Sequence, residues 1–267
     1  MTIANLEAPL QTKASRLVTE PRPPLSVVQA DSGCSGCHLR KACLPAEMSD
    51  GQISRLDSLK FVRRSVPAGR MLYRQGERFD FLYAVRSGTF KATLMMADGR
   101  EQVSGFYMAG EVMGLDGVAQ AEHASNSVAL EDSEVCAIAY ASLDESSHAD
   151  TRRLQQVISR LMSREIVREH RLMMLLGSMS AEERLASFLL NLSQRMKARG
   201  YSASEFNLRM TRAEIGSYLG LTLETVSRTF SQFQKQKLLQ VDKRYVRLHD
   251  LAALECAFSG TSSLRFH

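Results

Sequence analysis

The sequence contains no tryptophan, six prolines and five cysteines. It has no run of about 18 uninterrupted apolar residues, the length that a membrane-spanning helix needs, and its N-terminal segment lacks the charged start and apolar stretch of a secretory signal peptide. We therefore expect a cytoplasmic protein that does not enter a membrane. In a reducing compartment an odd number of cysteines is poorly suited to a disulfide framework, which leaves metal binding or thiol chemistry as their roles.

The composition indicates an ordinary globular protein with two domains. The 267 residues exceed a typical single domain, and 44% of them are hydrophobic while 24% are charged. The net charge of +5 favours a polyanionic partner such as a nucleic acid, although a surplus this small also fits a solvated surface. No arrangement of nucleophile, base and oxyanion-stabilising groups is recognisable, so we do not expect an enzyme.

Changes of pattern divide the chain into segments. Residues 1–30 carry three closely spaced prolines among small polar residues and are expected to form a mobile tail. From about Phe61 to Ile138, short apolar runs are separated by glycines, a pattern typical of an antiparallel β-roll or barrel. We place a domain that contains most of the cysteines and this roll at 31–145, a long helix at 146–178 and a further domain at 179–267.

A helical repeat of apolar residues runs between Thr151 and Leu176 without an intervening glycine or proline, and Gly177 is predicted to end the helix. The apolar residues that recur at steps of three, four or seven are Ile158, Met162, Ile166, Met173 and Leu176. An isolated helix of this length needs a partner for such a stripe, and its twin in a homodimer is the simplest choice. The alternative is that the helix packs only on its own domain.

Glu169 lies on this stripe between Ile166 and Met173. Across a two-fold axis it would face its own copy, and two desolvated carboxylates close together are costly unless they are protonated or paired with Arg168 or Arg171. We therefore expect a weakly held, switchable dimer. A glutamate that simply faces solvent is the alternative.

Two capping boxes, Ser180-Ala-Glu-Glu183 and Thr211-Arg-Ala-Glu214, predict the starts of two helices in the C-terminal domain. Gly220 is predicted to end the second of these, and Thr222 caps a third helix after a very short turn. Two helices joined so tightly are typical of a helix-turn-helix.

In a helix-turn-helix, the start of the second helix meets base edges in the major groove of double-stranded DNA. The residues at that position are Thr222, Glu224, Thr225, Ser227 and Arg228. Arginine can donate two hydrogen bonds to guanine, and glutamate can accept one from cytosine. Because Glu224 and Arg228 are four residues apart, a plain surface ion pair is the alternative interpretation.

The segment after this helix, LLQVDKRYVRLHD, predicts two short strands that turn near Asp242 and Lys243, the wing of a winged helix. The fold class is therefore predicted to be α+β, an N-terminal antiparallel β-roll followed by a long helix and a C-terminal winged helix-turn-helix. Contacts to DNA other than base reading are expected at Thr211, Arg212, Thr222, Thr225, Lys243 and Arg244, and phosphate contacts also at Arg209, Lys235 and Lys237.

Cys34, Cys37 and Cys43 form a C-x2-C-x5-C run in a predicted loop, and Cys136 stands apart at the end of the roll. Four thiolates fit the ligand count of either zinc or a 4Fe–4S cluster, and the spacing does not choose between them. Unmetallated thiols are a third alternative. The neighbouring His38 is expected to point outward.

The combination of these motifs resembles the FNR branch of the CRP/FNR family of bacterial regulators, over nearly the whole chain beyond the tail. The matching residues are the four cysteines above, RLMSREI in the long helix, AEERLASFLLNLS, and MTRAEIGSYLGLTLETVSRTF in the helix-turn-helix. The resemblance implies one oxygen-labile 4Fe–4S cluster per chain on the four cysteines, a β-roll sensor domain and a dimerisation helix. It also implies that the protein is a homodimer while the cluster is intact.

The same resemblance implies how DNA is read. Glu224, Ser227 and Arg228 match the family's base-reading E-x-x-S-R pattern, which implies a site similar to TTGAT-N4-ATCAA with Arg228 on the guanine. Regulators of this branch activate genes of anaerobic respiration, repress some aerobic genes and contact RNA polymerase. By similarity, the segment from Met95 to Val112 includes an activating surface.

One departure from the family concerns cyclic nucleotides. Gly110 and Glu111 resemble the start of a cyclic-nucleotide cassette, but His123 and Ala124 stand where the cassette has its phosphate-binding Arg-Ser. Without that arginine cyclic AMP loses its main charge partner, so we do not expect it as an effector. The rival functions are a zinc- or thiol-based redox regulator on the same DNA-binding frame and, more weakly, a haem-based gas sensor with His38 or His123 as axial ligand.

Overall fold

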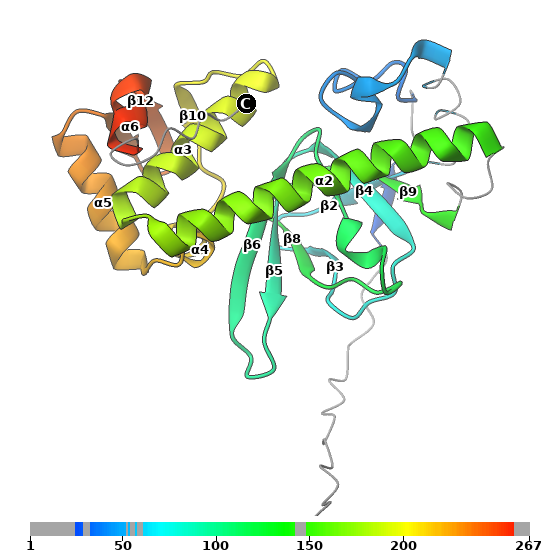
Figure 1. Cartoon of the computed structure of the whole chain (residues 1–267), viewed down its shortest axis with the longest axis horizontal. Helices are drawn as coiled ribbons and strands as arrows, with labels where there is room; N and C mark the ends of the chain where they lie inside the picture. Colours follow the sequence, from blue (N-terminus) through cyan, green and yellow to red (C-terminus); the bar gives the residue numbers. More distant parts are fainter. Residues whose placement is uncertain are drawn as a thin grey trace, which may run out of the picture.

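The computed structural model describes residues 25–28, 33–51, 53, 57, 61–141 and 148–258. A strand-rich domain, which we term the sensor domain after its expected role, comes first. A long helix α2 (His148–Ser178) runs past it, and a mostly helical C-terminal domain lies at the far end of α2 (Figure 1). This order confirms the predicted α+β class. Within the described residues, no helix combines the length and apolarity needed to cross a membrane.

Two antiparallel sheets form the sensor roll, as predicted. One has the strand order β1-β2-β9-β4-β7 and the other the order β3-β8-β5-β6. The strands are β1 (Ser26–Val28), β2 (Phe61–Val66), β3 (Met71–Tyr73), β4 (Phe81–Ser87), β5 (Thr89–Met95), β6 (Glu101–Met108), β7 (Val112–Met113), β8 (Asn126–Ala129) and β9 (Ser133–Ala139). Short 3-10 helices η1 (Leu44–Glu47) and η2 (Leu115–Gly117) interrupt the connections.

Side chains from both sheets fill the interior of the roll. Val85, Phe90 and Val135 are fully buried there and belong to one apolar cluster. The tight turn from β4 to β5 depends on Gly88, whose φ is +85° and where a Cβ atom would lie 2.0 Å from the Ser133 hydroxyl oxygen. Only glycine fits that position without displacing the neighbouring strand.

The N-terminal segment differs from its prediction. Strand β1 pairs antiparallel with β2, with Val27 opposite Arg64, so residues 26–28 belong to the sheet rather than to a mobile tail over 1–30. A segment of three residues is too short to show the alternating pattern of a strand. Pairing with β2 stabilises the extended conformation of this segment. Residues 1–24, 29 and 30 of the predicted tail lie outside the described residues.

Helix α2 ends at Ser178, as the predicted segment 146–178 does, but Gly177 does not end it. Gly177 lies inside its last turn, and the helix continues to Ser178 before the chain turns at Met179 into α3 (Ala181–Ala198). Arg184 of α3 stabilises this end because its guanidinium donates to the carbonyl oxygens of Leu176 at 2.8 Å and Met179 at 2.9 Å. The unsatisfied carbonyls of a helix end thus find a cationic donor.

The predicted apolar stripe of α2 does not act as one seam. Ile158 and Met162 pack into the sensor core, and Leu176 packs against the core of the C-terminal domain. Ile166 and Met173 remain 55% and 60% exposed. A residue advances about 100° around a helix, so Ile166 and Met173 lie about 80° and 60° around the helix from Ile158. Leu176 returns to the side of Ile158, but at the other end of the helix.

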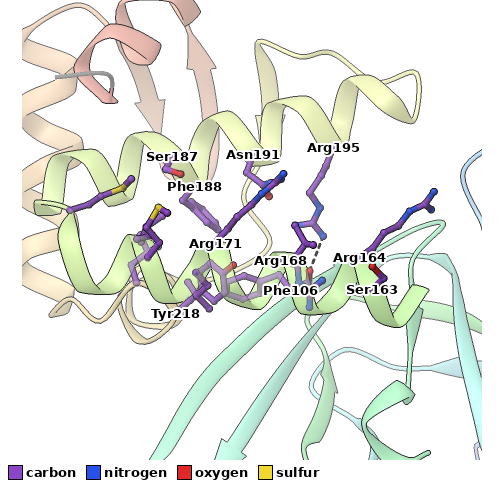
Figure 2. Close-up of a pocket in the computed structure, with 16 residues that line it drawn as sticks. Phe106, Ser163, Arg164, Arg168, Arg171, Ser187, Phe188, Asn191, Arg195 and Tyr218 are labelled. Atoms are coloured by element: carbon purple, nitrogen blue, oxygen red, sulfur yellow. Dashed lines mark hydrogen bonds between the residues drawn. The ribbon is translucent and has the colours of Figure 1, made fainter. Parts of the chain in front are cut away.

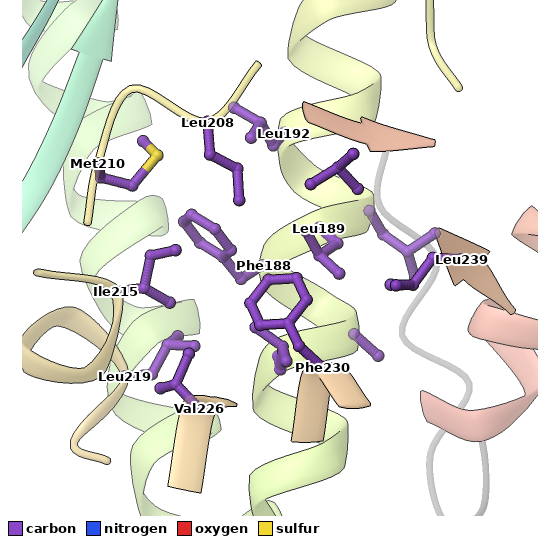
Figure 3. Close-up of a cluster of buried hydrophobic side chains, with 14 of the residues drawn as sticks. Phe188, Leu189, Leu192, Leu208, Met210, Ile215, Leu219, Val226, Phe230 and Leu239 are labelled. Atoms are coloured by element: carbon purple, nitrogen blue, oxygen red, sulfur yellow. The ribbon is translucent and has the colours of Figure 1, made fainter. Parts of the chain in front are cut away.

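The C-terminal domain is a winged helix, as predicted. Its remaining elements are β10 (Glu205–Asn207), α4 (Arg212–Leu219), α5 (Leu223–Lys235), β11 (Leu239–Asp242), β12 (Tyr245–Leu248) and α6 (Leu251–Phe258), with the strands in the order β10-β12-β11. Phe188 and Leu189 of α3 pack against Ile215, Val226 and Phe230 of the two short helices (Figure 3). This core fixes α4 and α5 relative to α3.

Candidate functional site

The four predicted cysteine ligands come together in the structure. Cys34, Cys37 and Cys43 lie in a turn-rich loop in which the Cys43 amide donates to the carbonyl of Leu39 at 2.9 Å. Cys136 lies in the middle of β9, where the sheet register places it beside Ala84 of β4. All four are free, partly buried thiols that line one cavity, which we term the cysteine cavity.

Apolar side chains enclose most of the cysteine cavity. The other lining residues are Leu39, Arg40, Leu44, Ala84, Val85, Arg86 and Ile138. His38 is exposed and does not line the cavity, as expected from the sequence. An apolar shell of this kind restricts solvent access to a group bound inside it.

Burial makes these thiols weak acids. It raises the pKa of Cys34 to about 12 and that of Cys43 to about 12, with the neighbouring cysteines acting in the same direction for both. Burial also raises the pKa of Cys136, although Arg63 and Arg86 oppose that change. A metal centre that binds here must displace the thiol protons.

Two arginines and an aspartate support the cavity, and sequence reasoning did not identify any of them. Arg63 is only 7% exposed and sits opposite Cys136 in the β2–β9 register. A guanidinium nitrogen of Arg86 lies 3.7 Å from Cys37 Sγ. Asp57 accepts hydrogen bonds from the backbone amides of Cys34 and, at 3.1 Å, Ser35. Arg63 and Arg86 lie on separate strands, β2 and β4, and no local sequence pattern links either of them to the cysteines.

The donor set can be compared with the two metal groups that it would suit. Four sulfurs bound to one zinc ion at about 2.3 Å lie about 3.8 Å from one another. Within the described residues, no three cysteine, histidine or carboxylate side chains are arranged to hold a single metal ion. Four thiols around a shared cavity, with two cations beside it, fit an anionic iron–sulfur cluster with all-cysteine ligation.

The two helices of the predicted helix-turn-helix are in place. Helix α4 begins at the Thr211 cap and ends at Gly220, whose φ of 62° lies in the left-handed region. Helix α5 begins at the Thr222 cap. Gly216 allows the tight turn, since a Cβ atom there would lie 2.6 Å from the Leu221 carbonyl oxygen.

The predicted base-reading residues share the exposed start of α5. Glu224, Ser227 and Arg228 are exposed. Arg228 contacts the Thr225 hydroxyl at 3.4 Å and forms no ion pair with Glu224 among the described contacts. The Thr222 hydroxyl accepts from the Thr225 amide at 3.1 Å, so these threonines shape the helix end that presents the other three side chains.

The wing is also as predicted. Lys243 and Arg244 are exposed in the turn that joins β11 to β12, and Lys243 has a left-handed φ of 53°. Lys235 lies beside Ser227 and Arg228 in a shallow hollow on α5. Cationic side chains on the wing and on α5 therefore flank the base-reading face.

Three residues expected to contact DNA make contacts with other residues of this chain. The guanidinium of Arg212 lies 3.5 Å from the ring centre of Phe230, and burial lowers the pKa of Arg212 to about 10. Arg209 forms an ion pair with Glu131 of the sensor domain at 3.1 Å. The Thr211 hydroxyl accepts from the Glu214 amide at 3.2 Å as a helix cap.

Comparison with known proteins decides the family. Residues 183–257 match a Crp-like helix-turn-helix domain, and residues 63–149 match a cyclic nucleotide-binding domain. The transcriptional regulatory protein btr of Bordetella pertussis is 48% identical over 222 residues, which cover 83% of this chain and 91% of that protein. The chain belongs to the CRP/FNR family of bacterial transcription regulators. It is thus a DNA-binding regulator and not an enzyme.

Other CRP/FNR proteins are similar over comparable lengths. The fumarate and nitrate reduction regulatory protein of Yersinia pestis is 40% identical over 221 residues, 83% of this chain and 88% of that protein. The solved structure of FixK2 from Bradyrhizobium japonicum superposes with a TM-score of 0.70 at 29% identity, and covers 76% of this chain and all of that one. The FixK2 structure confirms the predicted fold. The Yersinia pestis relative is, by its name, a regulator of fumarate and nitrate reduction.

The part of this CRP/FNR regulator that matches a cyclic nucleotide-binding domain has an aromatic centre. His123 is 2% exposed and stacks on Tyr73 with ring centres 3.8 Å apart. Phe79 meets the same imidazole edge-on at 5.5 Å, and Asp116 lies 3.4 Å from its Nδ1. The residue that replaces the cassette arginine is therefore packed among rings, where its imidazole contributes to the core of the roll.

Proposed function

We propose that this protein is an oxygen-sensing regulator of anaerobic metabolism genes, controlled by a 4Fe–4S cluster on Cys34, Cys37, Cys43 and Cys136. The observation that supports the proposal most is the convergence of these cysteines, from a loop and a distant strand, on one cavity. When bound, such a cluster supplies an oxygen-degradable core and ties the loop to β9 through thiolate bonds. Arg63 and Arg86 offset its negative charge.

The cysteine cavity adjoins the long helix. Ile158 of α2 belongs to a buried apolar cluster, and Cys34, Cys43 and Cys136 pack against that cluster, as does Met162 of α2. When the loop is held against β9, its side chains complete the surface on which the first half of α2 lies. Release of the loop removes part of that surface, so the position of α2 depends on the state of the cavity.

Homodimerisation through α2 is the second element of the proposal. Ile166 and Met173 lie exposed on α2, with Val167 and Met174 beside them. Glu169 is exposed on the same helix, and partial burial raises the pKa of its carboxyl while Arg168 opposes this change. Paired with its copy, it would weaken the dimer enough for the cluster to control association.

The dimer would read a palindrome similar to TTGAT-N4-ATCAA, with Glu224, Ser227 and Arg228 on base edges and Arg228 on the guanine.

Exposed Leu94, Met95 and Met96 at the end of the β5–β6 hairpin offer a contact surface for RNA polymerase. Cyclic AMP is not the effector, because His123 packs among rings in place of the phosphate-binding arginine. Such a regulator acts in the cytoplasm.

A bare thiol switch fits the cavity less well. Redox-sensing cysteines react as thiolates and have low pKa values. Cys34, Cys43 and Cys136 have raised values, so at neutral pH the free thiols are protonated and slow to react.

The proposal is tested by purifying the protein without oxygen and measuring iron, sulfide and zinc per chain. We expect about four irons and four sulfides and little zinc. Cys136→Ser should lose the cluster, whereas Cys256→Ser, which changes the one cysteine outside the set, should retain it. Stoichiometric zinc without iron, or a Cys136→Ser protein with full iron content, would contradict the cluster assignment.

A further inference from the structure

The middle of α2 touches the sensor domain with one narrow face. The two ends of the helix are held by the apolar contacts described above, one end on each domain. Between positions 163 and 174, every side chain of α2 is exposed except those of Glu165, Arg168 and Leu172. These three residues, which we term the contact face, follow one another at steps of three and four and therefore lie on one side of the helix.

Tyr107 of β6 binds two residues of the contact face. Its hydroxyl donates to the Glu165 carboxylate at 2.7 Å, and the Arg168 guanidinium donates to the same hydroxyl at 2.7 Å. Arg168 also bonds to Glu165 and lies over the Tyr107 ring, 4.6 Å from the ring centre. The two charged side chains are partly buried, at 31% and 27% exposure. Charge-assisted hydrogen bonds and a cation–π contact thus join β6 to the middle of α2.

Strand β6 leaves space for this contact at Gly105. A Cβ atom there would lie 3.0 Å from a guanidinium nitrogen of Arg168 and 3.2 Å from a ring carbon of Tyr107. The β5–β6 register shifts by one residue at Ser104, next to this glycine, and a bulge of this kind changes the direction of nearby side chains. Figure 2 shows Arg168 of α2 beside Phe106, the residue after the glycine. The local shape of β6 therefore fits the charged side chain of the helix.

The exposed residues expected at the dimer interface follow the contact face in step. Ile166, Glu169 and Met173 each come one residue after a member of the contact face. One residue corresponds to about 100° around a helix, so these side chains lie about a quarter turn from the contact face. A contact that fixes the rotation of α2 about its own axis therefore also fixes the direction in which they point.

We propose that Tyr107 is a positioning residue for dimerisation. With Glu165 and Arg168, it fixes the rotation of α2 at which the exposed side chains face a second copy of the chain. Because Tyr107 belongs to β6, the sensor sheet itself sets the geometry of the dimer helix. This inference rests on the homodimerisation through α2 proposed above, and it does not involve the cysteines.

The test compares the dimerisation of wild type and Tyr107→Phe, both purified without oxygen, by sedimentation equilibrium. Phenylalanine keeps the ring beneath Arg168 and removes only the hydroxyl. We expect the dissociation constant of the dimer to rise about tenfold, the effect of losing one hydrogen bond to a charged group. Gly105→Ala keeps all three polar groups but crowds the guanidinium, so it should also weaken the dimer.

The wing offers a matched control. The Tyr245 hydroxyl donates to Glu205 at 2.6 Å, and Arg247 pairs with the same carboxylate at 2.9 Å. Tyr245→Phe removes the same kind of hydrogen bond away from α2 and should leave the dissociation constant unchanged. Arg168→Lys keeps a cation near Tyr107, so it should retain more of the dimer than Arg168→Gln.

The outcomes separate this inference from the proposed function. A wild-type protein that stays monomeric without oxygen contradicts homodimerisation through α2, and the inference fails with it. If wild type dimerises and Tyr107→Phe associates equally or more tightly, only the inference is overturned. An equal loss in Tyr245→Phe would overturn it as well, because the effect would then not come from α2. Should Tyr107→Phe not fold, Gly105→Ala decides in the same way.

Discussion

Glu111 of the sensor domain accepts two hydrogen bonds from Arg195 of α3, at 3.0 and 2.6 Å. Arg199 donates to the same carboxylate at 2.6 Å. Burial raises the pKa of Glu111, but the two arginines outweigh this effect and hold the pKa below its ordinary value. This ion triad joins the two domains at the position where the sequence resembles a cyclic-nucleotide cassette.

The triad also lies next to the cysteine loop. At Gly110, the residue before Glu111, a Cβ atom would lie 2.8 Å from the carbonyl oxygen of Ala42, the residue before Cys43. The loop that carries three of the cysteines thus packs directly on the turn that carries Glu111. We therefore expect a change in the loop to reach the DNA-binding domain through this contact as well as through α2.

Replacing Glu111 by glutamine should destabilise the protein, because it leaves two partly buried arginines without their counter-charge. We expect the free energy of unfolding to fall by about 3 kcal/mol, measured by urea denaturation. Glu101→Gln, a change of an exposed glutamate on the neighbouring strand, should have little effect. Equal stability of the two variants would mean that the triad contributes nothing.

The triad should also give a defined pH dependence. Since folding lowers the pKa of Glu111, its contribution is fully present above the ordinary value of 4.5 and is lost as the pH falls through the lowered value. The difference in unfolding free energy between wild type and Glu111→Gln should therefore stay constant from neutral pH to about 5 and shrink at lower pH. If this difference instead grows as the pH falls, folding raises the pKa of Glu111 and the account of the triad is wrong.

Arg228→Ala should reduce affinity mainly at one base pair. We expect a loss of about 1–3 kcal/mol on the TTGAT-N4-ATCAA site and almost none on a site whose guanine is replaced. Fluorescence anisotropy with the two duplexes measures both. Lys243→Ala on the wing is the contrasting variant and should weaken both sites alike, with a shallower salt dependence. If Arg228→Ala also weakens binding to both duplexes equally, Arg228 contacts a phosphate and not the guanine.

Glu169→Ala should favour the dimer in air, because it removes the carboxylate that would face its own copy on α2. Sedimentation velocity at several protein concentrations measures the shift. Glu122→Ala, a change of an exposed glutamate outside α2, should leave association unchanged. An unchanged monomer–dimer equilibrium in Glu169→Ala would indicate that this carboxylate is solvated in the dimer.

Most of the correct predictions concern features that depend on residues close together in the sequence. The caps at Thr211 and Thr222 and the turn at Gly220 depend on a few neighbouring residues, so the helix-turn-helix was readable directly. The spacing of Cys34, Cys37 and Cys43 was equally local, whereas the place of Cys136 beside them depends on a strand register. The count of four ligands joined it to the other three as a hypothesis, and the family resemblance then favoured a cluster over zinc.

Features that depend on contacts between distant segments were missed. Arg63 and Arg86 reach the cysteine cavity from separate strands, and their sequence context is that of ordinary strand residues. The pairing of Glu111 with Arg195 spans 84 positions. The stripe on α2 was divided because part of that helix packs on each domain, and helical periodicity alone does not reveal which neighbour each turn meets.

Control by the cysteine cavity is tested most directly by operator binding before and after oxygen exposure. The protein is purified without oxygen, its affinity for a TTGAT-N4-ATCAA duplex is measured, and the same sample is measured again after air and chelator have removed its metal. We predict tight binding as a dimer at first and a large loss of affinity, with dissociation to monomers, afterwards. If the metal-free protein stays a dimer and binds the operator as tightly as before, the cysteine cavity does not control DNA binding.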